Sequence, residues 1–316
     1  MGTVWRPDSE QDFSSFEASG SALNSHQMHR SRHSMRLAGE NKTHRFTENA
    51  AHFLLLDYSG ENTMLVLGIE TATWLGSVAL VTESVVIAEY SLNIRRTHSE
   101  RLMGMIARLL SDADVALEDL DGIAVSIGPG SFTGLRIGLS TAKGLCFAND
   151  LPLLAVPTLE AMASRLCFAR LEVCPLLDAR GQEVYTARYD VSDGGMCATL
   201  APCAIPIDNL LEHISRPTIF SGDGTTIFRA YILDKLGDRA FFAPSDMAHP
   251  NAAAVARLGL SSIGQGGCAP IVELEPIYLR RSEAEAKGTA RTSRSDAQQA
   301  AIAPVTAQEE DPCGKS

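Results

Sequence analysis

The sequence predicts an α/β fold made of two copies of one mixed unit, and two observations lead to this prediction. Each half of residues 64–282 opens with three strands joined by short turns and continues with alternating helices and strands. Each half also ends its first strand with an acid, Glu70 in one and Asp178 in the other. The repeated order of elements indicates a duplication.

The first half is expected to form an N-terminal domain over residues 64–166. Apolar runs and alternating patterns predict its strands, and 3.6-residue periodicity predicts its helices. The expected elements, in order, are strands 64–69, 77–82 and 85–92, helix 98–111, strand 122–127, helix 134–148 and strand 151–156.

The second half is expected to form a C-terminal domain over residues 167–282. It repeats the opening of three strands and then the alternation of helix and strand. The expected elements are strands Cys174–Asp178, Glu183–Tyr189 and Ala198–Ile205, a helix around 207–214, strand 218–220 and helix 225–236.

The two ends of the chain differ in composition from the part between them. Residues 1–63 are polar and rich in Ser, His, Asn and Arg, and Met64 then opens an apolar strand. We expect translation to start at Met64, so that residues 1–63 are upstream sequence, and a disordered arm is the alternative. Residues 283–316 have no periodicity and are expected to be a disordered tail.

Composition excludes several classes of protein. The formal net charge of -11 and the sequence pI of about 5.2 argue against a protein that holds nucleic acid by itself, because binding phosphates needs a basic surface. The seven cysteines form no Cys-x2-Cys pair, which argues against a zinc knuckle and a disulfide framework. We find no apolar run of membrane-spanning length and no signal pattern, so the expected location is the cytoplasm.

The most informative stretch is the glycine loop, residues 128–136, between an apolar strand and an apolar helix. It contains Gly128, Pro129, Gly130, Ser131, Phe132, Thr133 and Gly134 in succession. Glycine permits positive φ and close backbone approach, while proline fixes φ, so this loop is built to a defined path. A helix-entry turn with Ser131 or Thr133 as N-cap is the simplest structural interpretation.

Two catalytic motifs do not fit the glycine loop. A P-loop needs Gly-x4-Gly-Lys-Ser/Thr, and here Leu135 and Arg136 follow Gly134. A nucleophile elbow needs a glycine two positions before and after the serine, and here Pro129 and Thr133 occupy those positions. A strand-to-helix turn whose amides meet an anion or a partner chain remains.

Four motifs in collinear order resemble the bacterial TsaB family. They are Leu67–Thr73, Gly128–Gly138, Leu177–Arg180 with Glu183–Tyr185, and Glu275–Arg280. The resemblance covers roughly residues 64–282. It implies two ribonuclease-H-like domains, the duplicated fold of the actin, sugar-kinase and Hsp70 superfamily. The family is also described as glycoprotease-like.

The resemblance also implies a role and partners. The family is the dimerisation subunit of the tRNA threonylcarbamoyladenosine complex, and it pairs through a helical bundle with the catalytic subunit TsaD. A TsaE-like ATPase as a further partner and a homodimer of the chain alone are open alternatives, and tRNA is reached only through the complex. The family is considered non-catalytic.

The residues expected to bind nucleotide or metal in this superfamily are altered here. The acids that end the first strands are followed by Thr71-Ala72-Thr73 and by Ala179-Arg180-Gly181, whose Cβ atoms obstruct a phosphate cradle. Catalytic relatives carry two histidines four residues apart on a helix, and here Leu102 stands four residues after His98. We therefore predict no cofactor and no metal centre.

The helices on either side of the glycine loop are the predicted partner-binding elements. Helix 98–111 is apolar over more of its surface than one core-facing stripe requires, and small residues in helix 134–148 permit close helix approach. Burial of both helices between sheet and second domain is the alternative. The predicted partner-binding residues are His98, Leu102, Met103, Ile106, Leu109, Gly128, Pro129, Gly130, Ser131, Phe132, Thr133, Gly134, Arg136, Ile137 and Gly138.

The function predicted from these observations is that of a non-catalytic assembly subunit for tRNA modification. It would pair with a TsaD-like catalytic paralogue that carries out the threonylcarbamoylation of adenosine next to the anticodon. An ATP-binding enzyme of the same fold is the alternative, and a metallopeptidase is a remote third.

Overall fold

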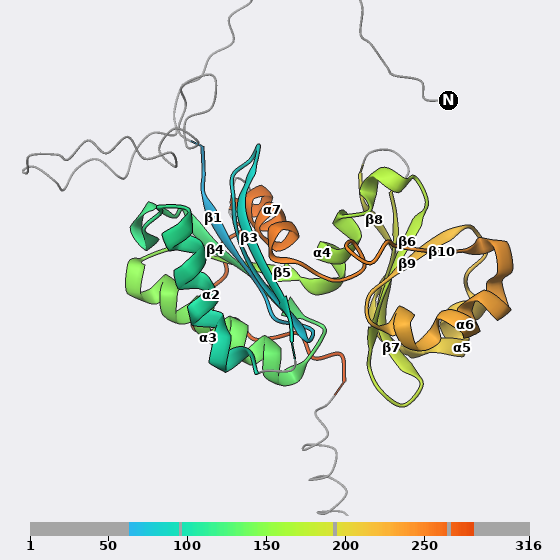
Figure 1. Cartoon of the computed structure of the whole chain (residues 1–316). Helices are drawn as coiled ribbons and strands as arrows, with labels where there is room; N and C mark the ends of the chain where they lie inside the picture. The colour runs from blue at the N-terminus through green and yellow to red at the C-terminus, as the bar shows by residue number, and fades with distance from the viewer. Residues whose placement is uncertain (1–62, 95–96, 192–194, 264–266, 281–316) are drawn as a thin grey trace, which may run out of the picture. The chain divides into compact units, whose positions relative to one another are not determined.

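A computed structural model describes residues 63–94, 97–191, 195–263 and 267–280, which form two five-stranded mixed sheets with helices (Figure 1). The predicted arm, apart from Thr63, and the predicted tail lie outside the described residues. No helix in the described ranges is long and apolar enough to span a membrane.

The first sheet has the strand order β3-β2-β1-β4-β5. Its strands are β1 (Val66–Glu70), β2 (Leu75–Val81), β3 (Val86–Asn93), β4 (Gly122–Gly128) and β5 (Leu153–Pro157). The first three strands form an antiparallel meander, and β4 and β5 extend the sheet in parallel beside β1. The carboxyl ends of β1, β4 and β5 therefore meet at one edge of the sheet.

Helices cover both faces of the first sheet. Helices α2 (His98–Asp112) and α3 (Phe132–Asn149) lie on one face, and α7 (Ala252–Ile263) lies on the other (Figure 1). The alternation along β1 explains this arrangement, because Leu67 packs with α2 and α3 while Val66 packs with α7. Both faces are apolar, which is typical of strands buried on two sides.

The second sheet repeats this pattern with the order β10-β9-β6-β7-β8. Its strands are β6 (Glu172–Asp178), β7 (Glu183–Asp190), β8 (Cys197–Pro206), β9 (Thr218–Ser221) and β10 (Ala240–Phe242). Again three antiparallel strands are followed by parallel ones. Helices α5 (Ile207–Glu212) and α6 (Gly224–Leu236) pack on one face, and α4 (Thr158–Ser164) packs on the other.

All the predicted strands and helices are present in the predicted order. Three further elements were not predicted from the sequence. These are α4, β10 and α7. The short length of α4 and β10 leaves them without a readable period, and the alanine-rich α7 lacks the contrast between apolar and polar faces. The short helical turns Leu117–Asp119, Cys167–Ala169 and Gly237–Arg239 complete the described elements.

Residues 252–280 follow the second sheet in the chain but return to the first. Helix α7 packs on β1 and β2. The segment after it, residues 267–280, runs from the start of β5 to the end of β4. Its Ala269 N donates to Leu153 O at 2.8 Å, and Ile277 N donates to Ile127 O at 2.7 Å. This C-terminal strap, residues 267–280, therefore contacts the strand that leads into the glycine loop.

Candidate partner-binding surface

The glycine loop is the turn from β4 into α3. Gly128 has φ +113°, a conformation that L side chains rarely adopt, and a Cβ atom there would meet the backbone oxygen of Ile277. Ser131 is the N-cap of α3, and its Oγ accepts a hydrogen bond from Gly134 N at 3.2 Å. The predicted helix-entry turn is thus present, with Ser131 rather than Thr133 as the cap.

The loop and α3 are seated on the turn between β1 and β2, residues 71–74. Ser131 N donates to Ala72 O at 2.7 Å. The first turns of α3 approach this hairpin so closely that a Cβ atom on Gly134 would meet Thr71 O, and one on Gly138 would meet Thr71 Oγ1. The glycines therefore set the distance between the helix and the hairpin.

His98 and Arg101, at the start of α2, bind the same hairpin from the other side. His98 Nε2 donates to Thr73 O at 2.8 Å, and His98 Nδ1 accepts from Arg101 Nη2 at 3.2 Å. Arg101 also donates to Trp74 O at 2.8 Å. Burial lowers the pKa of His98, which keeps the ring neutral at pH 7 and able both to donate and to accept. His98 is thus a buried structural link, not a surface group.

Arg136 packs against two aromatic rings at the start of α3. Its guanidinium carbon is 4.0 Å from the centre of the Phe132 ring, and its Nε donates to Tyr278 Oη at 2.9 Å. The Phe132 and Tyr278 ring centres are 4.9 Å apart. These contacts join the glycine loop to the C-terminal strap through cation–π and ring packing.

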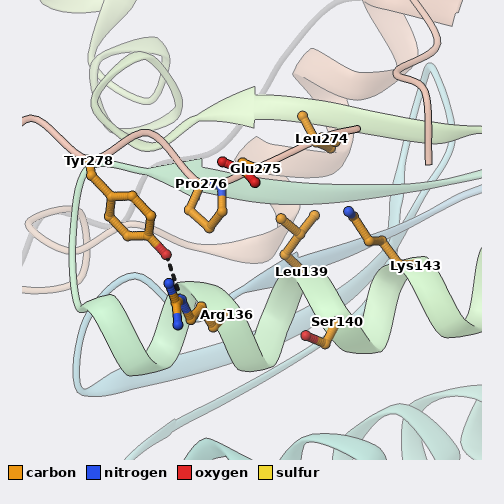
Figure 2. Close-up of a pocket in the computed structure, with 8 residues that line it drawn as sticks. All are labelled: Arg136, Leu139, Ser140, Lys143, Leu274, Glu275, Pro276 and Tyr278. Carbon is orange, nitrogen blue, oxygen red and sulfur yellow. Dashed lines mark hydrogen bonds between the residues drawn. The ribbon is translucent and has the colours of Figure 1, made fainter. Parts of the chain in front are cut away.

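Two hollows flank Arg136. Figure 2 shows the first, a cavity of about 250 Å³ between α3 and the strap, with Lys143 at the far end of the helix face. The second, about 550 Å³, is an open groove lined by residues of α3 and by Ser99 of α2. The residues that line the groove are Ser99, Phe132, Thr133, Arg136, Ile137, Ser140 and Thr141.

The structure divides the predicted partner-binding residues between the core and the surface. Leu102, Ile106 and Leu109 are at most 2% exposed and belong to the core on the first sheet, so their side chains do not reach the surface of this chain. The exposed face of α2 instead carries Met103, which is 52% exposed, together with Gly104, Ala107 and Arg108.

The geometry of α2 explains why these three side chains are buried. The residues 102, 105, 106 and 109 form one wide stripe that the sheet and α3 cover, so an apolar surplus inferred from the sequence is mostly core. On α3 the exposed or half-exposed members of the predicted set are Phe132, Thr133, Arg136 and Ile137, whereas Gly134 and Gly138 are buried. A partner-binding role stays a prediction for the whole set, and its exposed members carry the proposal below.

Other residues of this surface were not predicted from the sequence. Phe147 near the end of α3 is 82% exposed, and Trp74 in the hairpin is 69% exposed. Tyr278 and Arg101 support the loop and α2 through the bonds described above. Tyr278 stands in one of the recognised motifs, but nothing in the local pattern connects residue 278 with residue 136, because that contact depends on the chain returning to the first sheet.

The hairpin after β1, which the family resemblance implies as the position of a phosphate site, is packed in this chain. Thr71, Ala72 and Thr73 are buried, and Ala72 N already donates to the carboxylate of Glu70 at 2.5 Å. In the second half, Asp223 Oδ1 accepts from Asp178 N at 3.0 Å. Within the described ranges, no group of three or more His, Cys, Asp or Glu side chains could hold a metal ion.

Comparison with known proteins agrees with this architecture. Residues 86–287 match the family described as TsaD, tRNA N6-adenosine threonylcarbamoyltransferase. The chain is 35% identical over 227 residues to the tRNA threonylcarbamoyladenosine biosynthesis protein TsaB of Bacillus subtilis, covering 71% of this chain and 97% of that protein. It is 30% identical to TsaB of Escherichia coli over 70% of this chain and 96% of that protein.

Two solved structures have a similar fold. YeaZ from Pseudomonas aeruginosa superposes with a TM-score of 0.57 and 29% sequence identity, covering 68% of this chain and all of that one. A second Pseudomonas aeruginosa structure, titled as an uncharacterized protein with similarity to peptidase YeaZ, gives a TM-score of 0.59. Because the curated relatives are matched over almost their whole length, the chain belongs to the TsaB family.

Proposed function

We propose that the chain is a non-catalytic subunit of tRNA threonylcarbamoyladenosine biosynthesis that docks on a TsaD-type catalytic subunit. The observation that carries the proposal is the exposed side of α2 and α3, which surrounds an open groove and presents apolar and small residues to solvent. We name the exposed residues Met103, Gly104, Ala107, Ser140, Gly144 and Phe147, together with the half-buried Ile137, the docking surface.

The composition of the docking surface supports a helical partner. Gly104, Ala107 and Gly144 are small, and nothing lies within 4 Å of a Cβ atom built on either glycine. Small residues let a partner helix approach closely, while Met103 and Phe147 offer flexible and aromatic apolar contacts. Exposed apolar groups gathered on one helical face are typical of a protein interface.

The packed hairpin after β1 supports a role without catalysis. A phosphate that entered the first hairpin would have to displace Glu70 from Ala72 N and Ser131 N from Ala72 O. Glu70 and Ala72 are buried, so the displacement would leave unpaired polar atoms. The net charge of -11 further supports a subunit to which another protein brings the tRNA.

An ATP-binding transferase is the second candidate, because the matching family carries the name of a transferase. The two candidates differ in a direct observation. An enzyme of this fold should bind ATP with Mg²⁺ at micromolar concentration as an isolated chain, whereas a docking subunit should not. Calorimetric titration of the isolated chain with ATP and Mg²⁺ distinguishes them.

Further partners belong to the same proposal. A TsaE-like ATPase would join the assembled pair, and a second copy of this chain would cover the docking surface when TsaD is absent, all in the cytoplasm. Light scattering of the chain alone and with TsaD tests this, because adding TsaD should replace a homodimer by a heterodimer.

Two substitutions on α2 test the docking surface. Changing Met103 and Ala107 to Glu places two charges where a partner would have to desolvate them, so affinity for the cognate TsaD should fall about 100-fold or more. Ile227→Glu is the matched control, since Ile227 is 57% exposed on α6 of the other sheet. Equal affinities for the double variant and the control would contradict the proposal.

A further inference from the structure

Glu70 is a fully buried carboxyl group at the end of β1. Its exposed fraction is 0%, and its Oε1 accepts a hydrogen bond from Ala72 N at 2.5 Å. Among the described residues its Oε2 has no hydrogen-bond partner. A buried carboxylate oxygen without a donor is costly, so the ionised form of Glu70 is only half satisfied.

The neighbouring strand supplies a group that could pair with Oε2 of Glu70. Strands β1 and β4 pair in parallel with Ile69 opposite Val125, which places Ser126 beside Glu70. Ser126 Oγ is also buried and, within the described ranges, also has no hydrogen-bond partner. The Ser126 hydroxyl can donate to Oε2 of the ionised carboxylate or accept from the protonated carboxyl, so it can pair with Glu70 in either form.

Burial shifts the equilibrium between the protonated and the ionised form of Glu70. Desolvation raises the pKa of Glu70 from 4.5 to about 7, and the hydrogen bond from Ala72 N only partly opposes it. No charged side chain of the described residues contributes to this shift. The ionisable groups on elements around the carboxyl end of β1 are Glu89 on β3, His98 and Arg101 on α2, Arg136 on α3, Glu160 on α4 and Arg257 on α7.

Two hydrogen bonds connect Glu70 with the glycine loop. Ala72 donates its N–H to Glu70 and accepts at its C=O from Ser131 N, the N-cap of α3. The next residue, Thr73, accepts from His98 on α2. The hairpin that Glu70 holds is therefore the seat of both helices that form the docking surface.

We propose that Glu70 is a positioning residue whose proton controls how firmly the hairpin holds the start of α3, and thereby sets the affinity of the docking surface for its protein partner. The second half of this inference rests on the proposed function. An ionised carboxylate accepts the Ala72 N–H bond more strongly than a neutral carboxyl, so the docking surface is best ordered when Glu70 is charged. Affinity should therefore increase as pH rises through about 7.

The first experiment needs no partner. The ¹⁵N shifts of the Ala72 and Ser131 amides are followed in the full chain from pH 5.5 to 8.5. Both should titrate with one midpoint near 7, and both should be flat in Glu70→Gln, which keeps the acceptor to Ala72 but cannot ionise. Glu160→Gln is the matched control, because Glu160 is another acid whose pKa burial raises, and it should leave the titration unchanged. A flat Ser131 amide in the unsubstituted chain would overturn the inference.

The second experiment measures the dissociation constant for the cognate TsaD at pH 6 and pH 8. The unsubstituted chain and Glu160→Gln should bind about fivefold more tightly at pH 8, the effect of strengthening one buried hydrogen bond. Glu70→Gln should bind with the low-pH affinity at both values. A change between the two pH values that all three chains share belongs to a group other than Glu70.

The results of the two experiments distinguish control by Glu70 from docking on TsaD. Binding that is equally tight at both pH values overturns control by Glu70 and leaves the proposed docking intact. Titrating amides without any binding to TsaD overturns the proposed function and the partner half of the inference, while the connection from Glu70 to the glycine loop stands.

Discussion

At the scale of single residues, the end of β1 carries a buried acid with an unusual pKa. Among the described residues no charge compensates Glu70, and desolvation raises its pKa to about 7. Because the folded chain then holds a proton that the unfolded chain has already released, folding stability must depend on pH in this range.

The direction of this dependence follows from the raised pKa. Between pH 4.5 and 7 the folded state binds more protons than the unfolded state, so the stability contributed by Glu70 is fully present below 4.5 and is lost as pH rises through about 7. Between pH 5 and pH 8 the loss should be on the order of 2 to 3 kcal/mol.

Glu70→Gln should remove this loss. We expect the free energy of unfolding of the variant, relative to the unsubstituted chain, to increase by roughly 2 to 3 kcal/mol between pH 5 and pH 8. Urea denaturation followed by circular dichroism measures both chains at each pH. A constant difference between the two chains would mean that Glu70 does not titrate in this range.

At the scale of elements, the contact between α3 and the β1–β2 hairpin depends on the absence of side chains at two positions. Gly134 and Gly138 lie against Thr71, while Gly144 in the same helix faces open space. The same residue type therefore has opposite consequences along one helix, because one glycine permits a contact and the other only weakens helix propensity.

Substituting alanine at these positions should separate the two effects. Gly134→Ala places a Cβ atom against the backbone of Thr71, which should cost about 1 to 3 kcal/mol of stability and weaken binding to TsaD by displacing α3. Gly144→Ala should stabilise the chain by about 0.5 to 1 kcal/mol. Thermal unfolding of both variants is the measurement, and equal shifts in Tm would contradict the role given to Gly134.

The sequence could predict these elements but not all of their orientations. The periodicity of α2 located the helix within one residue of its observed end, yet it could not show that Leu102, Ile106 and Leu109 face the core while Met103 faces solvent. Apolar residues occur on adjacent positions of this helix, and a wide stripe has the same local pattern whether one or two partners cover it.

At the scale of the whole molecule, long-range contacts were beyond the reach of local patterns. The motifs predicted the duplicated fold, since each half repeats its meander and its parallel strands. The return of α7 and the C-terminal strap to the first sheet depends on packing between residues far apart in the chain, such as Ile277 with Ile127. The position of Tyr278 beside Arg136 follows from that return.

The return of the chain to the first sheet also connects the C-terminal strap with the start of α3. Arg280, at the end of the described strap, donates to Ala179 O at 2.8 Å and pairs with Glu183 at 3.2 Å. Tyr278, two residues earlier, holds Arg136 at the docking surface. The strap thus connects the second half's first hairpin with the glycine loop of the first half.

We propose that this chain provides a docking surface for TsaD and catalyses no reaction by itself. Reconstituted modification with purified TsaD, tRNA and threonylcarbamoyl-adenylate tests it most directly, with the full chain, without it, and with the Met103→Glu, Ala107→Glu variant. The account predicts no product from the chain alone, product when both subunits are present, and a loss of product with the variant. Modified tRNA formed by the chain without TsaD, or full activity with the variant, would contradict it.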